Sequence, residues 1–225
     1  MSGLSTANRP HGTLLLVRHA HTEMAGRFCG ASDPPLSQHG IAQLAGVNER
    51  LAAYPLIHIF SSGLKRARQT AESIAQCRGL KVQYLDFLHE LAFGSWEGLD
   101  WDQVVARDPA YAQHWLDNYP AVPAPGGERF EDFCRRVQRA TSVIAAQVED
   151  GCAVAFTHAG VIRSFLASLP RSHHASFDPR QCDYLSCWEV SWDGEQWRFV
   201  GHTAEPQAAS GVTREGAWRQ TGTVL

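Results

Sequence analysis

The sequence predicts an α/β fold, a three-layer sandwich with a mostly parallel central sheet, helices on both faces and an aromatic lid insertion. Short apolar runs typical of buried strands alternate with longer segments whose apolar residues recur at helical spacing. The composition is that of a globular protein, with 44% hydrophobic and 19% charged residues. Because 225 residues suit one domain, we expect a single domain over 1–225, loosely ordered at 1–12 and about 202–225.

Six segments are predicted to be strands. Four of them are short and alternate with helices, as in a buried parallel sheet: Leu14–Val17, Leu56–Phe60, Lys81–Leu85 and Cys152–Phe156. The third is the least apolar, so we expect it nearer an edge of the sheet. The last two, Tyr184–Trp192 and Gln196–Val200, are joined by Asp193-Gly194, a dipeptide typical of tight hairpins. We expect this pair to be antiparallel or at an edge.

Four helices are predicted, each from apolar residues at third-and-fourth spacing. Ser37 is placed to cap the first helix, Pro125-Gly126-Gly127 precedes the third, and Pro170 ends the last. The apolar stripes are Ile41, Leu44, Ala45, Leu51 and Ala52; Ala67, Thr70, Ala71, Ile74 and Ala75; Phe130, Phe133, Cys134, Val137, Ala140, Thr141, Ile144, Ala145 and Val148; and Val161–Leu169.

Residues 94–127 break this alternation and are predicted to be an insertion over one end of the sheet. They are rich in aromatic side chains, which include Trp96, Trp101, Trp115 and Tyr119. Two interpretations stay open. Either the aromatic side chains form a lid that faces a substrate, or they only pack the insertion onto the sheet.

The charge excludes some classes of partner. The chain has 20 Lys and Arg against 23 Asp and Glu, a formal net charge of −3, which argues against bulk binding of nucleic acid or an anionic membrane. No apolar run is long enough to span a bilayer, and the N-terminus lacks the apolar core of a secretory signal. We therefore expect a cytoplasmic protein, a monomer or homodimer, whose six cysteines are mostly small buried hydrophobes.

Side chains suited to catalysis follow four of the predicted strands, each at the carboxyl end of the strand. In open α/β sheets ligands bind beyond these ends, so residues that follow different strands meet at one edge. Singly, each is better explained as a solvated turn or a surface charge, but together they indicate a site. They are Arg18 and His19 after the first strand, Ser61, Ser62 and Arg66 after the second, His89 and Glu90 after the third, and Thr157 and His158 after the fourth.

Two arginines and two histidines at one edge fit a dianionic phosphoryl group. Guanidinium groups stay charged and match phosphate oxygens with paired hydrogen bonds, and phosphoryl transfer depends mainly on positioning and charge stabilisation. A histidine is able to act as the covalent nucleophile, and nearby arginines favour its neutral, attacking form. A carboxyl group at the rim, such as that of Glu90, is suited to protonate the leaving alkoxide and then deprotonate water.

Four motifs resemble those of the histidine phosphatase superfamily, which includes the phosphoglycerate mutases. They run in order over most of the chain, and as a set they are highly specific. The matching segments are Leu16-Val17-Arg18-His19-Ala20; Ser61-Ser62-Gly63-Leu64-Lys65-Arg66-Ala67; His89-Glu90-Leu91-Ala92-Phe93-Gly94, followed by Trp96-Glu97-Gly98; and Thr157-His158-Ala159-Gly160-Val161-Ile162-Arg163.

The resemblance implies a role for each residue of the cluster. It makes His19 the phosphorylated nucleophile and Glu90 the general acid and base. Arg18, Arg66 and His158 would hold the phosphoryl group. It implies neither a metal nor an organic cofactor, and it implies a small phosphorylated metabolite as the partner.

The sequence departs from the family pattern beside the predicted nucleophile. Ala20 replaces the usual glycine, and His21 replaces the usual glutamate. The asparagine that contacts phosphate in the family is missing, so we expect Thr22 or Arg27 to replace it. Ala159 is a further predicted phosphate-binding residue.

A metal site is the weaker interpretation of the histidines. His19 and His21 are two residues apart, and His173-His174 are adjacent. No cysteine or carboxylate completes an obvious ligand set beside them.

The substrate is predicted from the subgroup that the sequence resembles. The short loop before Pro35-Leu36-Ser37 and the run Phe93-Gly94-Ser95-Trp96-Glu97-Gly98 resemble α-ribazole phosphatases, which remove phosphate from α-ribazole 5′-phosphate in cobalamin synthesis. An aromatic lid also suits a nucleoside-like leaving group. The alternatives are a broad-specificity histidine phosphatase, a cofactor-dependent phosphoglycerate mutase and a non-catalytic phosphate-binding protein. Glu128 is expected either to contact substrate or to cap the long helix, with the cap the safer prediction.

Overall fold

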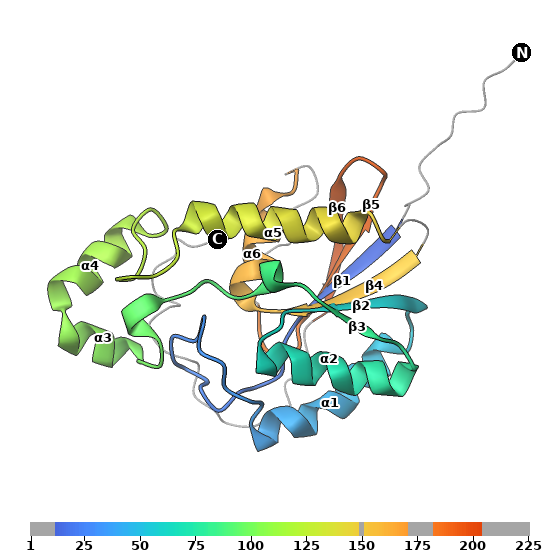
Figure 1. Ribbon diagram of the computed structural model, residues 1–225, viewed down its shortest axis with the longest axis horizontal. Helices are drawn as coiled ribbons and strands as arrows, with labels where there is room; N and C mark the ends of the chain where they lie inside the picture. The colour runs from blue at the N-terminus through green and yellow to red at the C-terminus, as the bar shows by residue number, and fades with distance from the viewer. Residues whose placement is uncertain (1–11, 149–150, 171–181, 204–225) are drawn as a thin grey trace, which may run out of the picture.

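A mixed sheet of six strands forms the central layer of the fold (Figure 1). The computed structural model describes residues 12–148, 151–170 and 182–203. The strands lie in the order β3-β2-β4-β1-β5-β6. Their bounds are Gly12–Arg18 (β1), Leu56–Ser61 (β2), Val82–Tyr84 (β3), Gly151–Thr157 (β4), Cys187–Trp192 (β5) and Trp197–Thr203 (β6).

The first four strands form a parallel sheet, and the last two add an antiparallel hairpin. β1 pairs with β4, and β2 pairs with both β3 and β4, all in parallel. β5 runs antiparallel to β1, and β6 antiparallel to β5. The predicted parallel core, the edge position of β3 and the late hairpin are thus confirmed. Arg18 lies opposite Thr157, and Ser61 opposite Phe156, so the carboxyl ends of β1, β2 and β4 meet at one edge.

Helices cover both faces of the sheet (Figure 1). Because successive strand side chains point to opposite faces, β1 contributes to two hydrophobic cores. Leu14 and Leu16 pack with residues of α5 and α6, whereas Leu15 and Val17 pack with residues of α1 and α2. The bounds of these helices are Gln38–Leu51 (α1), Lys65–Arg78 (α2), Phe130–Ala145 (α5) and Ala159–Ser168 (α6).

The first helix is rotated from its predicted orientation. Ser37 caps α1 as predicted, since its side chain accepts a hydrogen bond from the backbone N–H of Gly40. The buried face holds Gly40 and Leu51, whereas Ile41 is 49% exposed. A Cβ on Gly40 would lie 2.1 Å from the carbonyl oxygen of His21, so this close approach requires glycine and fixes the rotation of the helix. The prediction is therefore wrong for the exposed members of the stripe, Ile41, Ala45 and Ala52.

The stripes predicted for α2 and α5 are confirmed, because their apolar residues face the sheet. In α2 the buried residues include Ala67, Ala71 and Ile74. In α5 they include Phe133 and Val137. These two helices carry no glycine that packs against backbone, so the apolar period alone sets their orientation.

Residues 94–127 form a helical insertion at one end of the sheet, where α3 and α4 lie beyond the end of α5 (Figure 1). The insertion has a core of its own, completed by Phe28 from the loop after β1. Trp96 and Trp115 are each only 3% exposed in that core. These two rings therefore have a packing role, but they pack the insertion on itself and on Phe28 and not onto the sheet. The elements between β3 and α5 are two short 3₁₀ helices, Asp86–Leu88 (η1) and Gly94–Trp96 (η2), and the helices Trp101–Arg107 (α3) and Pro109–Asn118 (α4).

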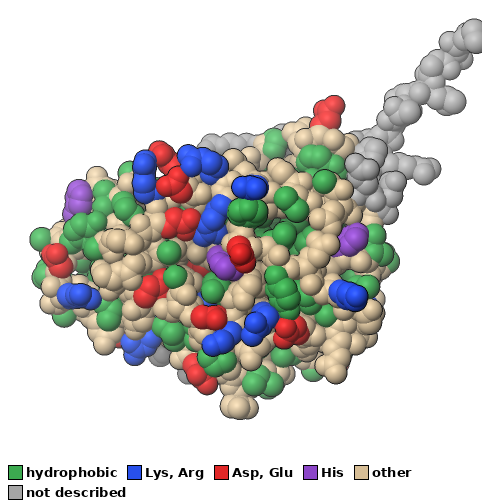
Figure 2. Space-filling model, in the orientation of Figure 1, with side chains coloured by type: hydrophobic (Ala, Val, Ile, Leu, Met, Phe, Trp, Pro, Cys, Tyr) green, Lys and Arg blue, Asp and Glu red, His purple; other side chains and the backbone are tan. Residues whose placement is uncertain are grey.

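The predicted loose ends fall mainly outside the described residues, at 1–11 and 204–225. Gly12 begins β1 and His202 lies in β6, so both predicted boundaries are slightly too far into the fold. None of the helices in the described ranges is both long and apolar enough to cross a membrane. On the face shown in Figure 2, basic and acidic side chains are interspersed. Among the cysteines, Cys152, Cys182 and Cys187 are buried, whereas Cys77 is exposed.

Candidate active site

The predicted cluster forms at the carboxyl edge of the sheet. His19 follows β1, Arg66 lies in the first turn of α2, and His158 follows β4. The ring centroids of His19 and His158 are 5.0 Å apart, and Nε of Arg66 lies 3.2 Å from Nδ1 of His158. Residues distant in the sequence are thus in contact, as the strand-end argument predicts.

The hydrogen bond at Nδ1 decides the tautomer of His19. This atom lies 2.8 Å from the carbonyl oxygen of Ala20, and a carbonyl oxygen only accepts, so Nδ1 carries the hydrogen. In the neutral ring Nε2 then holds a lone pair. Burial, and then the charges of Arg66 and Arg18, hold the pKa of His19 well below its usual range. His19 is therefore a neutral imidazole with a free nucleophilic nitrogen at neutral pH.

The tautomer of His158 is the opposite one. The Nε–H of Arg66 always donates, so Nδ1 of His158 accepts, and the ring hydrogen sits on Nε2. Nε2 lies 2.8 Å from Oγ of Ser62, to which it donates. Burial, and then the charge of Arg66, lower the pKa of His158 well below its usual range. The two histidine rings, which meet edge to face, are both neutral and differ in which nitrogen carries hydrogen.

Arg66 is buried although its described partners are all neutral. The side chain is 1% exposed. Beyond His158, the guanidinium donates to the carbonyl oxygens of Ser32 at 2.7 Å, Cys29 at 3.1 Å and Gly30 at 3.0 Å. Carbonyl groups satisfy the hydrogen bonds of the cation without cancelling its charge. This charge is therefore available to an anion bound at the edge of the sheet.

Arg18 supplies the second cation and is held against an aromatic ring. Its Nη1 donates to the carbonyl oxygen of Cys182 at 2.7 Å, and its guanidinium carbon lies 3.9 Å from the centroid of the Tyr184 ring. Tyr184 also packs beside His19, with 5.6 Å between the ring centroids. The predicted strand included Tyr184, but β5 begins only at Cys187. The sequence reasoning therefore missed this ring as part of the site.

Glu90 is held by the N-terminus of α6. Its Oε2 accepts from the backbone N–H of Gly160 at 3.0 Å, and its Oε1 accepts from that of Leu91 at 2.9 Å. A Cβ on Gly160 would lie 2.3 Å from Oε1 of Glu90, so glycine is required for the carboxylate to come this close. The contact with Gly160 uses a backbone N–H that the first turn of α6 leaves without a partner inside the helix. Glu90 is thus fixed to the same helix that His158 precedes.

Arg136, on α5, holds the loop that carries Glu90, and the sequence reasoning missed it. It donates to the carbonyl oxygens of Phe87 and His89, and at 2.9 Å to that of Glu90 itself. Its fork also binds both carboxylate oxygens of Glu128, at 2.7 and 2.8 Å. The prediction that Glu128 caps α5 is therefore wrong, because the N-cap residue is Arg129, the helix has no side-chain cap, and the Glu128 carboxylate binds Arg136. Contact of Glu128 with substrate stays a prediction.

The three remaining predicted residues lie in the loop after β1 and at the start of α6. Oγ1 of Thr22 accepts from the backbone N–H of Met24 at 3.2 Å, so Thr22 shapes its own loop. Arg27 is exposed and donates to the carbonyl oxygen of Gly98 at 2.7 Å, which ties the loop to the insertion. Neither residue is hydrogen-bonded to the two histidines in the described contacts. Ala159 begins α6 directly after His158.

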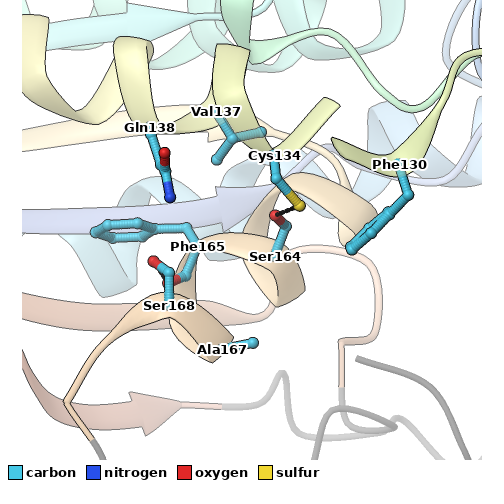
Figure 3. A pocket seen from close by; sticks show the side chains of 8 residues that line it. All are labelled: Phe130, Cys134, Val137, Gln138, Ser164, Phe165, Ala167 and Ser168. Carbon is cyan, nitrogen blue, oxygen red and sulfur yellow. Dashed lines mark hydrogen bonds between the residues drawn. The ribbon is translucent and has the colours of Figure 1, made fainter. Parts of the chain in front are cut away.

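A groove of about 210 Å³ runs between α5 and α6 (Figure 3). Its lining includes Phe130 and Phe165, and Sγ of Cys134 lies 3.3 Å from Oγ of Ser164 within it. None of the predicted site residues lines it. We therefore assign no part of the phosphoryl chemistry to this groove.

The free energy of unfolding is expected to fall as the pH is lowered below about 6.5, the ordinary pKa of histidine. In the folded protein His19 and His158 stay neutral well below that pH, because burial lowers the pKa of both. The unfolded chain binds protons in this range, so it carries more protons than the folded state. The stabilisation is therefore full above about pH 6.5 and is lost as the pH falls. Denaturant titrations at a series of pH values measure it.

His19→Asn isolates the contribution of one histidine. Asn retains a donor toward the carbonyl oxygen of Ala20 and has no group that titrates. The variant is expected to reduce the slope of the free energy of unfolding against pH, below about pH 6.5, by up to about 1.4 kcal/mol per pH unit, which is the value for one proton. His114→Asn, at an exposed position on α4, is the matched control. An unchanged slope in His19→Asn would contradict a neutral, proton-excluding His19.

Comparison with known proteins places these residues in context. The sequence model of the histidine phosphatase superfamily, branch 1, matches residues 14–205. A bifunctional protein of Mycobacterium tuberculosis is 35% identical over 156 residues, which are 68% of this chain and 43% of that protein. The chain thus spans less than half the length of this relative. The adenosylcobalamin/α-ribazole phosphatase of Salmonella typhimurium is 31% identical over 158 residues, 69% of this chain and 78% of its own.

Solved structures show the same architecture. The mycobacterial glucosyl-3-phosphoglycerate phosphatase in complex with inorganic phosphate superimposes with a TM-score of 0.71 at 26% sequence identity. The superposition covers 84% of this chain and 96% of that one. The names of these relatives cover more than one phosphate ester, so similarity alone leaves the leaving group open.

Proposed function

The chain belongs to branch 1 of the histidine phosphatase superfamily, and from this we propose that it is a phosphomonoesterase that acts through a phosphohistidine on His19. One observation carries the proposal. The Nδ1–H of His19 is bound to a carbonyl, which leaves the lone pair on Nε2. The ring lies beside His158, and the positive charges of Arg66 and Arg18 act on it. A neutral imidazole surrounded by cations is suited to attack an anionic phosphoryl group.

In the first step, Nε2 of His19 attacks phosphorus and the ester P–O bond breaks. The Glu90 carboxyl gives its proton to the leaving alkoxide, so the alcohol departs neutral. Arg18 and Arg66 stabilise the charge on the equatorial oxygens. The Nε2–H of His158, which donates to Oγ of Ser62 in the structure, turns to one of these oxygens when the ester is bound. The product of this step is a phosphohistidine and a Glu90 carboxylate.

In the second step, the Glu90 carboxylate takes a proton from water. The water oxygen attacks phosphorus, and the P–N bond to His19 breaks. Inorganic phosphate leaves, and both His19 and Glu90 return to their starting protonation states. Neither step uses a metal ion, so we expect turnover to persist in the presence of a chelator.

We propose α-ribazole 5′-phosphate as the substrate. Two observations support this choice: the resemblance of the Phe93–Gly98 run to α-ribazole phosphatases, and the 31% identity to a relative that bears that name. The half-buried ring of Tyr184 beside His19 would favour an aromatic leaving group at the mouth of the site. Trp96 and Trp115 lend no such support, because they are buried in the insertion.

A panel of phosphate esters tests this proposal. It includes α-ribazole 5′-phosphate, nucleotides, sugar phosphates and phosphoglycerates, each assayed with and without 2,3-bisphosphoglycerate. We expect hydrolysis without the bisphosphate, and the highest kcat/KM with α-ribazole 5′-phosphate. A requirement for the bisphosphate would instead indicate a mutase. Preference for another ester would overturn the substrate assignment but not the proposed phosphatase activity. Phosphate binding without turnover would indicate a non-catalytic protein.

A further inference from the structure

Glu97, in the loop after η2, collects backbone N–H groups around its carboxylate. Oε1 accepts from Ala31 at 2.8 Å and from Phe93 at 2.9 Å. Oε2 accepts from Ser32 at 3.0 Å, and Gly30 donates to both oxygens at 3.2 and 3.1 Å. Burial raises the pKa of this carboxyl, but the hydrogen bonds that Glu97 accepts from Ser32, Phe93 and Ala31 outweigh it and lower the pKa. The loop thus folds around the negatively charged carboxylate of Glu97, which its backbone N–H groups hold in place.

The same loop presents its carbonyl groups to Arg66. The peptide between Cys29 and Gly30 offers its carbonyl to Arg66 and its N–H to Glu97. The next peptide, between Gly30 and Ala31, does the same. In a trans peptide the C=O and N–H groups point in opposite directions, so each of these units lies between the anion and the cation. Two consecutive peptide dipoles therefore join Glu97 to Arg66 without a direct ion pair.

Gly30 makes this arrangement possible. A Cβ at this position would lie 1.9 Å from the carbonyl oxygen of Leu91 and 2.8 Å from Oε1 of Glu97. The loop backbone thus packs directly on the segment that follows Glu90. Since hydrogen bonds in a chain polarise one another, the Glu97 carboxylate strengthens the carbonyls as acceptors for Arg66.

We propose that Glu97 is a positioning residue for Arg66, acting through the Cys29–Ser32 loop to hold the guanidinium where it binds the phosphoryl group. The inference rests on the proposed function, because it assigns the consequence of this geometry to phosphate binding. The proposal also gives the loop after β1 a part in phosphate binding, which the sequence predicts for Thr22 or Arg27. The N–H groups of Gly30, Ala31 and Ser32 donate to Glu97. The loop therefore acts on the bound phosphoryl group through Arg66, because these N–H groups are not available to contact it directly.

Glu97→Gln tests the proposal, because a carboxamide has one acceptor oxygen and turns an NH₂ group toward the loop N–H groups. We expect faster hydrogen exchange in residues 29–33 and about a tenfold weaker affinity for inorganic phosphate, the effect of misplacing a charge-assisted contact. The acid limb of the pH profile of kcat/KM is expected to move to higher pH, because Arg66 lies less firmly beside His19. Glu97→Asp, which keeps the charge, should restore part of the phosphate affinity.

Asp102→Asn is the matched control, since Asp102 is an exposed carboxylate on the neighbouring helix α3. Wild-type exchange and affinity in Glu97→Gln would overturn the inference. Faster exchange with unchanged phosphate affinity and pH profile would also overturn it, because Glu97 would then only hold the loop. Weaker phosphate affinity without faster hydrogen exchange in residues 29–33 would also overturn it, because Glu97 would then not act on Arg66 through the loop.

The test separates this inference from the proposed function. If the wild-type protein hydrolyses no ester but binds phosphate, and Glu97→Gln weakens that binding, the positioning role stands while the phosphatase proposal fails. If the wild-type protein neither hydrolyses esters nor binds phosphate, both are overturned.

Discussion

Replacing His19 with alanine is expected to reduce kcat for an aryl phosphate by at least about 10⁴-fold, because loss of a covalent nucleophile removes the whole two-step route. The expectation follows from the tautomer of His19, whose only free nitrogen is Nε2. Neighbouring groups offer no substitute. Nδ1 of His158 accepts from Arg66, and its Nε2 carries hydrogen. The measurement is steady-state turnover together with acid-quenched trapping of a phosphoenzyme.

Two further variants make this result specific. His19→Asn keeps a donor toward the carbonyl oxygen of Ala20 but has no nucleophilic lone pair, so it should fold and be as inactive as His19→Ala. His114→Ala changes an exposed histidine on α4 and should retain wild-type kcat. Retained turnover in both His19 variants, or an acid-labile phosphoenzyme in either, would exclude His19 as the nucleophile.

Replacing Glu90 with glutamine is expected to lower kcat by about 10² to 10⁴ for an alkyl phosphate, the usual contribution of a general acid and base. The loss should be smaller for the first step with an activated aryl phosphate, because its leaving group departs without a proton. The carboxylate oxygens accept from Leu91 and Gly160, and glutamine retains only one acceptor oxygen. Turnover of the two ester classes, with single-turnover rates for each step, measures the effect.

The comparison of ester classes separates chemistry from folding. A simple loss of structure would lower both rates equally, and the free energy of unfolding would fall with them. Glu49→Gln, at an exposed position on α1, is the matched control and should leave both rates unchanged. Equal losses in the first-step rate for alkyl and aryl esters, in a fully folded Glu90→Gln protein, would contradict proton transfer from Glu90 to the leaving group.

The regular part of the fold could be predicted from the apolar periods in the sequence. The strands and the helices α2 and α5 follow those periods, because burial in the two cores decides their orientation. The helix α1 departs from its period because Gly40 packs against the backbone of His21. A close approach between backbones depends on the tertiary fold, so a local pattern of apolar residues does not predict it.

The residues of the candidate site likewise fall into a group that the sequence predicts and a group that it does not. Arg18, His19, Arg66, Glu90 and His158 were found because each follows a strand that ends at the same edge of the sheet. Arg136 and Glu97 bind backbone groups of distant loops, and such contacts have no sequence signature. Glu97 lies in a recognised motif, but the motif alone did not show what its carboxylate holds.

The strand order has a consequence for how the protein becomes active. β4 lies between β1 and β2, so His19 and Arg66 are brought together by a strand that begins only at Gly151. A nascent chain that has emerged only as far as α5 contains His19, both arginines and Glu90, but it lacks the strand that lies between β1 and β2. The proposed site is therefore able to form only after β4 and the His158 that follows it have been synthesised.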